Sequence, residues 1–207
     1  MTEEFKIIIP ARYDSSRFPG KPLADIHGKP MIQRVYDAAV DAGASEVVIA
    51  TDSMLIGMAA EEFGAPVCMT LAQHATGTDR LCEVVEKLEW TDDTVVVNLQ
   101  GDEPLIPPAI VNQVAINLIK NTEAGCATLY TGLSSEDAAD PNVVKVVTDA
   151  KGYALYFSRS VIPYIRDTDD AAVAGLVYKK HIGLYAYKVD LLKKFRAMQS
   201  CELEQAE

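Results

Sequence analysis

The sequence predicts an α/β fold: a three-layer, doubly wound, mostly parallel sheet with a β-rich second half. Short β-branched runs alternate with helical periodicity through residue 120. Within that stretch, 7–9 and 95–97 are apolar on both faces, as central parallel strands are. After about residue 125 the strand-like runs follow one another with less helix between them, which favours antiparallel additions.

Eight runs of β-branched and aromatic residues, bounded by turn residues, predict strands. In chain order they are 6–10, 47–51, 67–69, 94–100, 127–130, 143–148, 154–158 and 182–187.

Four helices are expected between the strands of the first half. Apolar residues at i, i+3, i+4 and i+7 predict amphipathic helices over 32–40 and 81–88. Asp52 or Ser53 is expected to cap a helix that Gly64 ends, and Pro107-Pro108 to start one running toward Lys120. A further helix is expected to begin at Ser200, and 167–175 to form an acidic surface loop.

The chain of 207 residues carries 19 Lys+Arg against 30 Asp+Glu, a net charge of −11, which argues against general binding to nucleic acid or anionic membranes. No export signal and no apolar run of membrane-spanning length is visible, so we expect one soluble, cytoplasmic domain. Four scattered cysteines with no Cys-x-x-Cys pair predict buried thiols in a reducing compartment; these are Cys68, Cys82, Cys126 and Cys201.

The turn after the first strand, 10–22, lies where a doubly wound sheet places its ligand crevice. It has no G-x-G-x-x-G, and Gly20-Lys21 is followed by proline, so a dinucleotide fold and a Walker P-loop are both disfavoured. Residues 12–34 hold five bases and two acids, a local charge of +3. Its guanidinium, ammonium and hydroxyl groups suit a polyphosphate, although a solvated basic loop would have the same composition.

A second motif, N-L-Q-G-D-E-P at 98–104, follows an apolar strand at the same predicted edge. Asp102 is therefore a candidate ligand for Mg²⁺ held against nucleotide phosphates, or else an ordinary turn acid. A third, H-A-T-G-T-D-R at 74–80, could read a base edge through backbone N–H groups and hydroxyls, or simply cap the following helix.

A fourth feature is a second basic region, 151–188, which has a local charge of +3 and six of the nine tyrosines. Arg159, Arg166 and His181 could bind the carboxylate of an acidic co-substrate while tyrosine rings face a sugar. A tyrosine-rich dimer interface is the alternative, and the two can coexist.

Together these motifs resemble a known family. The string P-A-R-Y-D-S-S-R-F-P-G-K-P-L at 10–23 is similar to the cytidylyltransferases that activate acidic sugars. With V-V-I-A-T-D (47–52), H-A-T-G-T-D-R, N-L-Q-G-D-E-P, V-K-V-V (144–147), Y-A-L-Y-F-S-R (153–159) and K-H-I-G-L-Y-A-Y (180–187), the chain resembles the 3-deoxy-manno-octulosonate (Kdo) cytidylyltransferase family from about Phe5 to Glu207.

The resemblance implies a nucleotide-diphospho-sugar transferase-like fold and a cytoplasmic, Mg²⁺-dependent homodimer. Such an enzyme joins CTP to Kdo, giving CMP-Kdo and pyrophosphate for lipopolysaccharide assembly. It further implies one nucleotidyltransferase domain over 1–207, with a nucleotide-binding half (1–125) and a sugar-binding and dimerisation half (126–207).

Residue roles follow from the same resemblance. Catalytic roles are expected for Arg12, Lys21 and Asp102, with Asp102 binding the metal. Nucleotide contacts are expected from Ala11, Arg12, Ser15, Arg17, Lys21, His74, Thr78, Arg80 and Gln100. Contacts with Kdo are expected from Arg159, Arg166, His181 and Tyr185.

Similar proteins continue past the position of Glu207 through a strand and a second metal-binding aspartate. The expectation from sequence is therefore a truncated chain with impaired turnover. Alternatives are a cytidylyltransferase for a sialic-acid-type sugar and a noncatalytic nucleotide-binding or dimerisation fragment. A glycosyltransferase is disfavoured, because its diphosphate substrates rarely need the basic loop.

Overall fold

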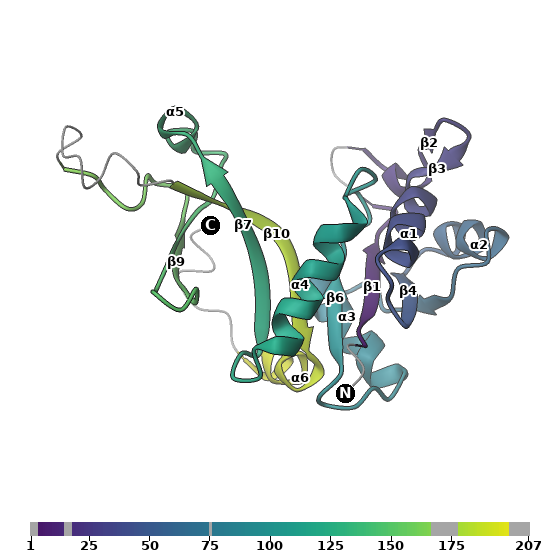
Figure 1. Cartoon of the computed structure of the whole chain (residues 1–207). Coiled ribbons are helices and arrows are strands. Elements are labelled where there is room, and N and C mark those ends of the chain that lie inside the picture. Colours follow the sequence, from purple (N-terminus) through teal and green to yellow (C-terminus); the bar gives the residue numbers. More distant parts are fainter. Residues whose placement is uncertain (1–3, 15–17, 75, 167–177, 199–207) are drawn as a thin grey trace. The chain divides into compact units, whose positions relative to one another are not determined.

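The computed structural model describes residues 4–14, 18–74, 76–166 and 178–198 (Figure 1). The chain forms two compact units. Unit 1 comprises Met1–Ala127 and Leu184–Glu207, and unit 2 comprises Thr128–Gly183. The expected division at 125/126 lies close to the first boundary, whereas the chain from Leu184 onward belongs to unit 1.

The sheet of unit 1 has the order β5-β4-β1-β6-β10. Strands β1 (Lys6–Ala11), β4 (Glu46–Thr51), β5 (Val67–Met69) and β6 (Val95–Asn98) run parallel, and Figure 1 shows β4, β1 and β6 side by side. The last four residues of β10 (Tyr178–Lys188) add to β6 in the antiparallel sense. The carboxyl ends of β1 and β6 therefore meet at one edge.

Helices connect these strands and form two layers. Helices α1 (Met31–Asp41) and α4 (Pro108–Lys120) contact each other, and so do α3 (Gly77–Lys87) and α6 (Val189–Ala197). Ile8 packs against the α3 and α6 side chains, so Ile7 and Ile9 point to the opposite face. The arrangement is the expected three-layer α/β fold.

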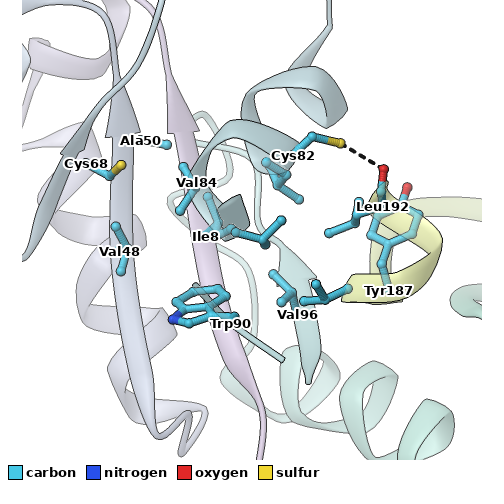
Figure 2. Close-up of a cluster of buried hydrophobic side chains, with 13 residues drawn as sticks. Ile8, Val48, Ala50, Cys68, Cys82, Val84, Trp90, Val96, Tyr187 and Leu192 are labelled. Atoms are coloured by element: carbon cyan, nitrogen blue, oxygen red, sulfur yellow. Dashed lines mark hydrogen bonds between the residues drawn. The ribbon is translucent and has the colours of Figure 1, made fainter. Parts of the chain in front are cut away.

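The core between the sheet and the α3–α6 layer combines branched aliphatic side chains with the aromatic rings of Trp90 and Tyr187 (Figure 2). Ile8, Val48 and Val96 come from neighbouring strands, and Val84 and Leu192 come from the two helices. The Cys82 thiol donates to the Leu192 carbonyl oxygen over 3.1 Å, which ties α3 to α6. Burial raises the pKa of Cys82 to about 11, so this thiol stays protonated at neutral pH.

Unit 2 is antiparallel. Strand β8 (Lys145–Thr148) pairs with β9 (Ala154–Ser158) on one side and with the first part of β10 on the other. Strand β7 (Cys126–Leu133) also pairs with β10, and α5 (Ser135–Ala138) follows it. The antiparallel character expected after residue 125 is confirmed.

All eight predicted strands form, with shifts of a few residues at their ends. Helix α2 (Met54–Glu62) is capped by Ser53, whose hydroxyl accepts from the Ile56 amide over 3.4 Å, rather than by Asp52. The sequence did not predict α5, α6, the hairpin β2 (Asp25–Ile26)–β3 (Lys29–Pro30) or the 3-10 turn η1 (Lys21–Leu23).

Three of the four cysteines lie within the described residues. Cys68 and Cys82 are buried free thiols as predicted, whereas Cys126, the first residue of β7, is exposed. Cys201, the acidic loop 167–175 and the helix expected at Ser200 lie outside the described residues. Over the described ranges, no helix combines the length and apolarity needed to cross a membrane.

Candidate nucleotide-binding site

The turns that follow β1 and β6 bring Lys21 and Asp102 together. Lys21 opens η1, and Asp102 lies in the turn after β6. The Lys21 Nζ atom is 2.6 Å from Asp102 Oδ2, although the two residues are 81 positions apart. The sequence placed both at one sheet edge because parallel neighbours end together, and the structure has them there in direct contact.

Gly20 closes the turn after β1. Its amide donates to the Tyr13 carbonyl oxygen over 2.8 Å, and its φ of 73° lies in the left-handed region that favours glycine. A Cβ at this position would also lie 3.3 Å from the Tyr13 ring. Glycine therefore lets the turn fold back so that Lys21 faces Asp102. Ser15 and Arg17, expected to contact nucleotide, lie outside the described residues.

Gly101 sets the separation of the two turns. A Cβ on Gly101 would lie 2.8 Å from the Pro10 carbonyl oxygen and 3.3 Å from Ile32 Cδ1. No side chain fits at that separation from a backbone oxygen, so the turn carrying Asp102 can approach the end of β1 only with glycine at this position. The buried Ala11 completes the end of β1.

Arg12 reaches across to the third predicted motif. Its Nη2 atom donates to the His74 carbonyl oxygen over 2.6 Å. The His74 ring in turn contacts the buried carboxylate of Glu83 on α3. Arg12 and the segment before α3 thus form one connected group in unit 1.

The start of α3 is fixed by a capping box. The Thr76 hydroxyl accepts from the Asp79 amide, and the Asp79 carboxylate accepts from the Thr76 amide over 2.9 Å. Gly77 lies beside Gln100, whose side-chain amide donates to Asn98 Oδ1 over 3.2 Å. Gln100 and the start of α3 are therefore neighbours.

Thr78, another predicted nucleotide contact, lies beside the hydroxyl of the buried Tyr187. Burial raises the pKa of Tyr187, so its phenol stays protonated. Its ring stacks on that of Tyr185, with centroids 5.7 Å apart. In this structure Thr78 thus faces β10.

Arg80 is fully buried, which differs from the direct nucleotide contact expected from the sequence. Its Nη1 atom donates to the Thr70 hydroxyl, and its Nη2 atom is 3.6 Å from Asp52 Oδ2. Burial lowers the pKa of Arg80 while Asp52 opposes that shift, and a guanidinium remains charged in either case. Through its hydrogen bond to Thr70, Arg80 holds the beginning of the segment that leads to α3.

The carboxylate of Asp102 fits a cation that a nucleotide carries. Its side chain is 53% exposed, and Lys21 Nζ contacts its Oδ2 atom. Over the described ranges, no three His, Cys, Asp or Glu side chains gather to form a metal cage. Magnesium commonly uses one or two carboxylates together with substrate phosphates, and that donor set is the one Asp102 could complete.

Unit 2 holds three of the residues expected to contact the sugar, whereas Tyr185 belongs to unit 1. His181 Nε2 is 3.0 Å from the Thr128 hydroxyl, and its ring meets Phe157 edge-on. Arg159 Nη1 donates to the Pro141 carbonyl oxygen over 3.3 Å, and Arg166 is exposed in the chain after β9.

Lys145 organises the neighbourhood of Arg159. This fully buried ammonium donates to the carbonyl oxygens of Asp140 (3.1 Å), Val143 (2.8 Å) and Arg159. Its three donors are thereby satisfied. Neither Lys145 nor Glu83 was predicted from the sequence as a site residue. A charged residue beside the apolar stripe of α3 was the available signal for Glu83, and the lone lysine in a β-branched run was the signal for Lys145.

A family model described as cytidylyltransferase matches residues 6–207. The chain belongs to the cytidylyltransferase family. Curated relatives of this family include the 3-deoxy-manno-octulosonate cytidylyltransferase of Haemophilus ducreyi, 54% identical over 99% of this chain and 82% of the relative. The 3-deoxy-manno-octulosonate cytidylyltransferase 1 of Actinobacillus pleuropneumoniae serotype 5b is 53% identical over 98% of this chain and 83% of the relative.

Solved structures agree with this cytidylyltransferase assignment. A CMP:2-keto-3-deoxy-manno-octonic acid synthetase complexed with CTP has a TM-score of 0.90 at 45% identity, over 98% of this chain and 81% of that one. A nucleotidyl transferase from Methanothermobacter shares the fold at a TM-score of 0.57 and 15% identity, over 95% of this chain and 77% of that one. Both the α/β fold and the resemblance stated from sequence are confirmed.

Proposed function

We propose that this cytidylyltransferase transfers CMP from CTP to Kdo, giving CMP-Kdo and pyrophosphate. The observation that carries the proposal is identity above 50%, over nearly the whole chain, to proteins that all bear this one name. The similar structure complexed with CTP supports the choice of nucleotide.

The reaction is an in-line displacement at the α-phosphorus. The anomeric hydroxyl oxygen of Kdo attacks and forms the new bond to the α-phosphorus, its proton passes to solvent water, and the bond from the α-phosphorus to the bridging oxygen breaks, releasing pyrophosphate. Positioning and preplaced positive charge are the main means of accelerating such a step. Arg12 and Lys21 are the cations at the sheet edge that would grip the triphosphate and offset charge on the leaving pyrophosphate.

The contact between Lys21 and Asp102 has a simple place in this scheme. In the structure the ammonium and the carboxylate neutralise each other. A nucleotide would supply phosphate oxygens to Lys21 and its accompanying cation to Asp102, so each partner exchanges one opposite charge for another. Magnesium, when bound there, would polarise the phosphates and neutralise their charge.

The remaining assignments are also proposals. His74, Thr78 and Gln100 would recognise cytosine and ribose, with Arg80 supporting them. Arg159, Arg166, His181 and Tyr185 would surround the carboxylate and hydroxyls of Kdo. We further propose a homodimer in the cytoplasm, a reducing compartment that suits the free thiols of Cys68 and Cys82.

A competition assay tests the sugar assignment. With CTP and Mg²⁺ and both sugars present, purified protein should convert Kdo in preference to N-acetylneuraminate, whatever the absolute rate of pyrophosphate release. Preference for N-acetylneuraminate would overturn the sugar assignment. Calorimetric binding of CTP without turnover on either sugar would favour a noncatalytic nucleotide-binding role.

A further inference from the structure

Glu83 is a buried carboxylate on α3 that the proposed reaction does not use. Its side chain is only 9% exposed, and it contacts three polar groups of the protein. It accepts from the Leu71 amide over 2.9 Å and from Lys87 Nζ over 2.7 Å, and it contacts His74 Nε2. A carboxylate is expensive to bury, and these three contacts compensate for the loss of water.

Two of the three partners belong to the segment 70–74, which leads from β5 toward α3. Glu83 Oε2 contacts both the Leu71 amide and the His74 ring, so it fixes a backbone atom and a side chain of that segment at once. Arg80, one helical turn earlier, holds Thr70 at the start of the segment. Helix α3 thus fastens this loop through two buried charged side chains.

The fastened segment determines where Arg12 lies. The His74 carbonyl oxygen accepts from Arg12 Nη2 over 2.6 Å, and the His74 ring is the part that Glu83 contacts. A displacement of His74 would therefore move the acceptor that orients the guanidinium. The path from Glu83 to Arg12 consists of two polar contacts through one residue, all inside unit 1.

We infer that Glu83 is a positioning residue for the nucleotide: by fixing His74, it holds the Arg12 guanidinium in the orientation that binds the triphosphate. The inference rests on the proposed function, because it needs Arg12 to contact CTP. Glu83 itself touches no substrate in this account.

A double-mutant cycle tests the inference by calorimetric titration of CTP with Mg²⁺. Glu83→Gln keeps the size of the side chain and removes its charge, and we expect it to weaken CTP binding about tenfold. In the Arg12→Ala background the same change should alter the affinity less than twofold. Glu86→Gln, an exposed position on the same helix paired with Arg196, is the control and should have less than a twofold effect in either background.

Kinetics separates positioning from a general loss of structure. In the Glu83→Gln variant the KM for CTP should rise about tenfold while the KM for Kdo changes less than twofold. Equal increases in both values would overturn the inference. If Glu83→Gln fails to melt cooperatively, Glu83→Asp keeps the charge but shortens the side chain by one methylene, so the carboxylate withdraws from His74 and Leu71. Its effect on CTP binding should likewise vanish in the Arg12→Ala background.

The outcomes distinguish the inference from the proposed function. If Arg12→Ala weakens CTP binding and Glu83→Gln acts independently of it, the two effects adding, the positioning role is wrong and the function stands. If Arg12→Ala leaves CTP affinity unchanged, the triphosphate role of Arg12 is wrong and the positioning role fails with it.

Discussion

The basic residues near the first turn have different partners, although they are close in sequence. Lys21 contacts Asp102 and Arg12 contacts the His74 carbonyl, both at the sheet edge. By contrast, Lys29 pairs with Asp37 over 2.7 Å. Arg34 donates to the carbonyl oxygens of Ile26 and His27 and so braces the β2–β3 hairpin. The local charge of +3 counted over 12–34 therefore overstates the charge delivered to the site.

Lys21→Ala should lower kcat/KM for CTP by about 10² to 10³-fold, because a cation that stabilises charge developing on a leaving group is typically worth that much. Lys120→Ala, at the end of α4, removes the same charge from the same unit and should change kcat/KM less than twofold. Pyrophosphate release at varied CTP measures both. Equal losses in the two variants would remove Lys21 from the site.

Glu83 also predicts a pH dependence of stability. Burial alone would raise the pKa of Glu83, but hydrogen bonds from Lys87, His74 and Leu71 outweigh it and lower the pKa from 4.5 to about 2. The ionised carboxylate therefore stabilises the fold above about pH 4.5, and that contribution is lost as the pH falls toward 2.

In urea titrations, Glu83→Gln should reduce the free energy of unfolding at pH 7 by on the order of 2 kcal/mol. The difference from the unsubstituted protein should shrink as the pH is lowered from 4.5 to 2. A difference that stays constant across that interval would contradict the assignment.

At the residue scale, contacts that follow from the order of the strands could be predicted from the sequence. Contacts that depend on how deeply a side chain is buried could not. Lys21 and Asp102 were predicted at one edge because each follows a buried parallel strand. The burial of Arg80 was not predicted, because a basic residue in the first turn of an amphipathic helix is usually solvated. Its burial depends on residues distant in sequence, since Thr70 accepts from Nη1 and Asp52 lies 3.6 Å from Nη2.

At the scale of elements, the strands were predictable because short β-branched runs that are apolar on both faces favour a buried strand over other secondary structure. Strand β5, over Val67–Met69, and strand β9, over Ala154–Ser158, have the predicted bounds. Helix α6 was missed because β10 passes directly into it at Lys188, which provides no side-chain cap, and no glycine or proline separates the two.

The turn after β6 gives an element-scale prediction. Gly101→Ala would place a Cβ 2.8 Å from the Pro10 carbonyl oxygen, so the turn must move away from β1. We expect a loss of about 1–3 kcal/mol in stability, as for overpacked sites, and at least a tenfold loss in kcat/KM because Asp102 moves with the turn. Thermal melting and pyrophosphate release measure the two effects.

Gly57→Ala in α2 is the matched control. Its added Cβ would lie 3.5 Å from the flexible Met69 side chain, an ordinary contact. Alanine in a helix interior should leave stability unchanged or raise it by about 0.5–1 kcal/mol, with activity intact. If Gly101→Ala were tolerated equally well, the close approach of the two turns would not matter to the site.

At the scale of the whole molecule, charge is distributed unevenly. The chain carries −11 overall, so a polyanionic nucleotide is repelled at long range and must be held by local cations. The charges counted over 12–34 and 151–188 within an acidic chain led to the prediction of local cationic sites, and alternating strands and helices predicted the fold. Composition could not assign the sugar. That assignment came from the motifs that resemble the Kdo cytidylyltransferases and from relatives more than 50% identical.

A crystal structure with CTP and Mg²⁺ tests the central claim most directly. The account predicts the triphosphate within hydrogen-bond distance of Arg12 and Lys21, with the cation at Asp102 and the direct Lys21–Asp102 contact opened. A nucleotide bound elsewhere, with Lys21 still on Asp102 and Arg12 still on the His74 carbonyl, would contradict it.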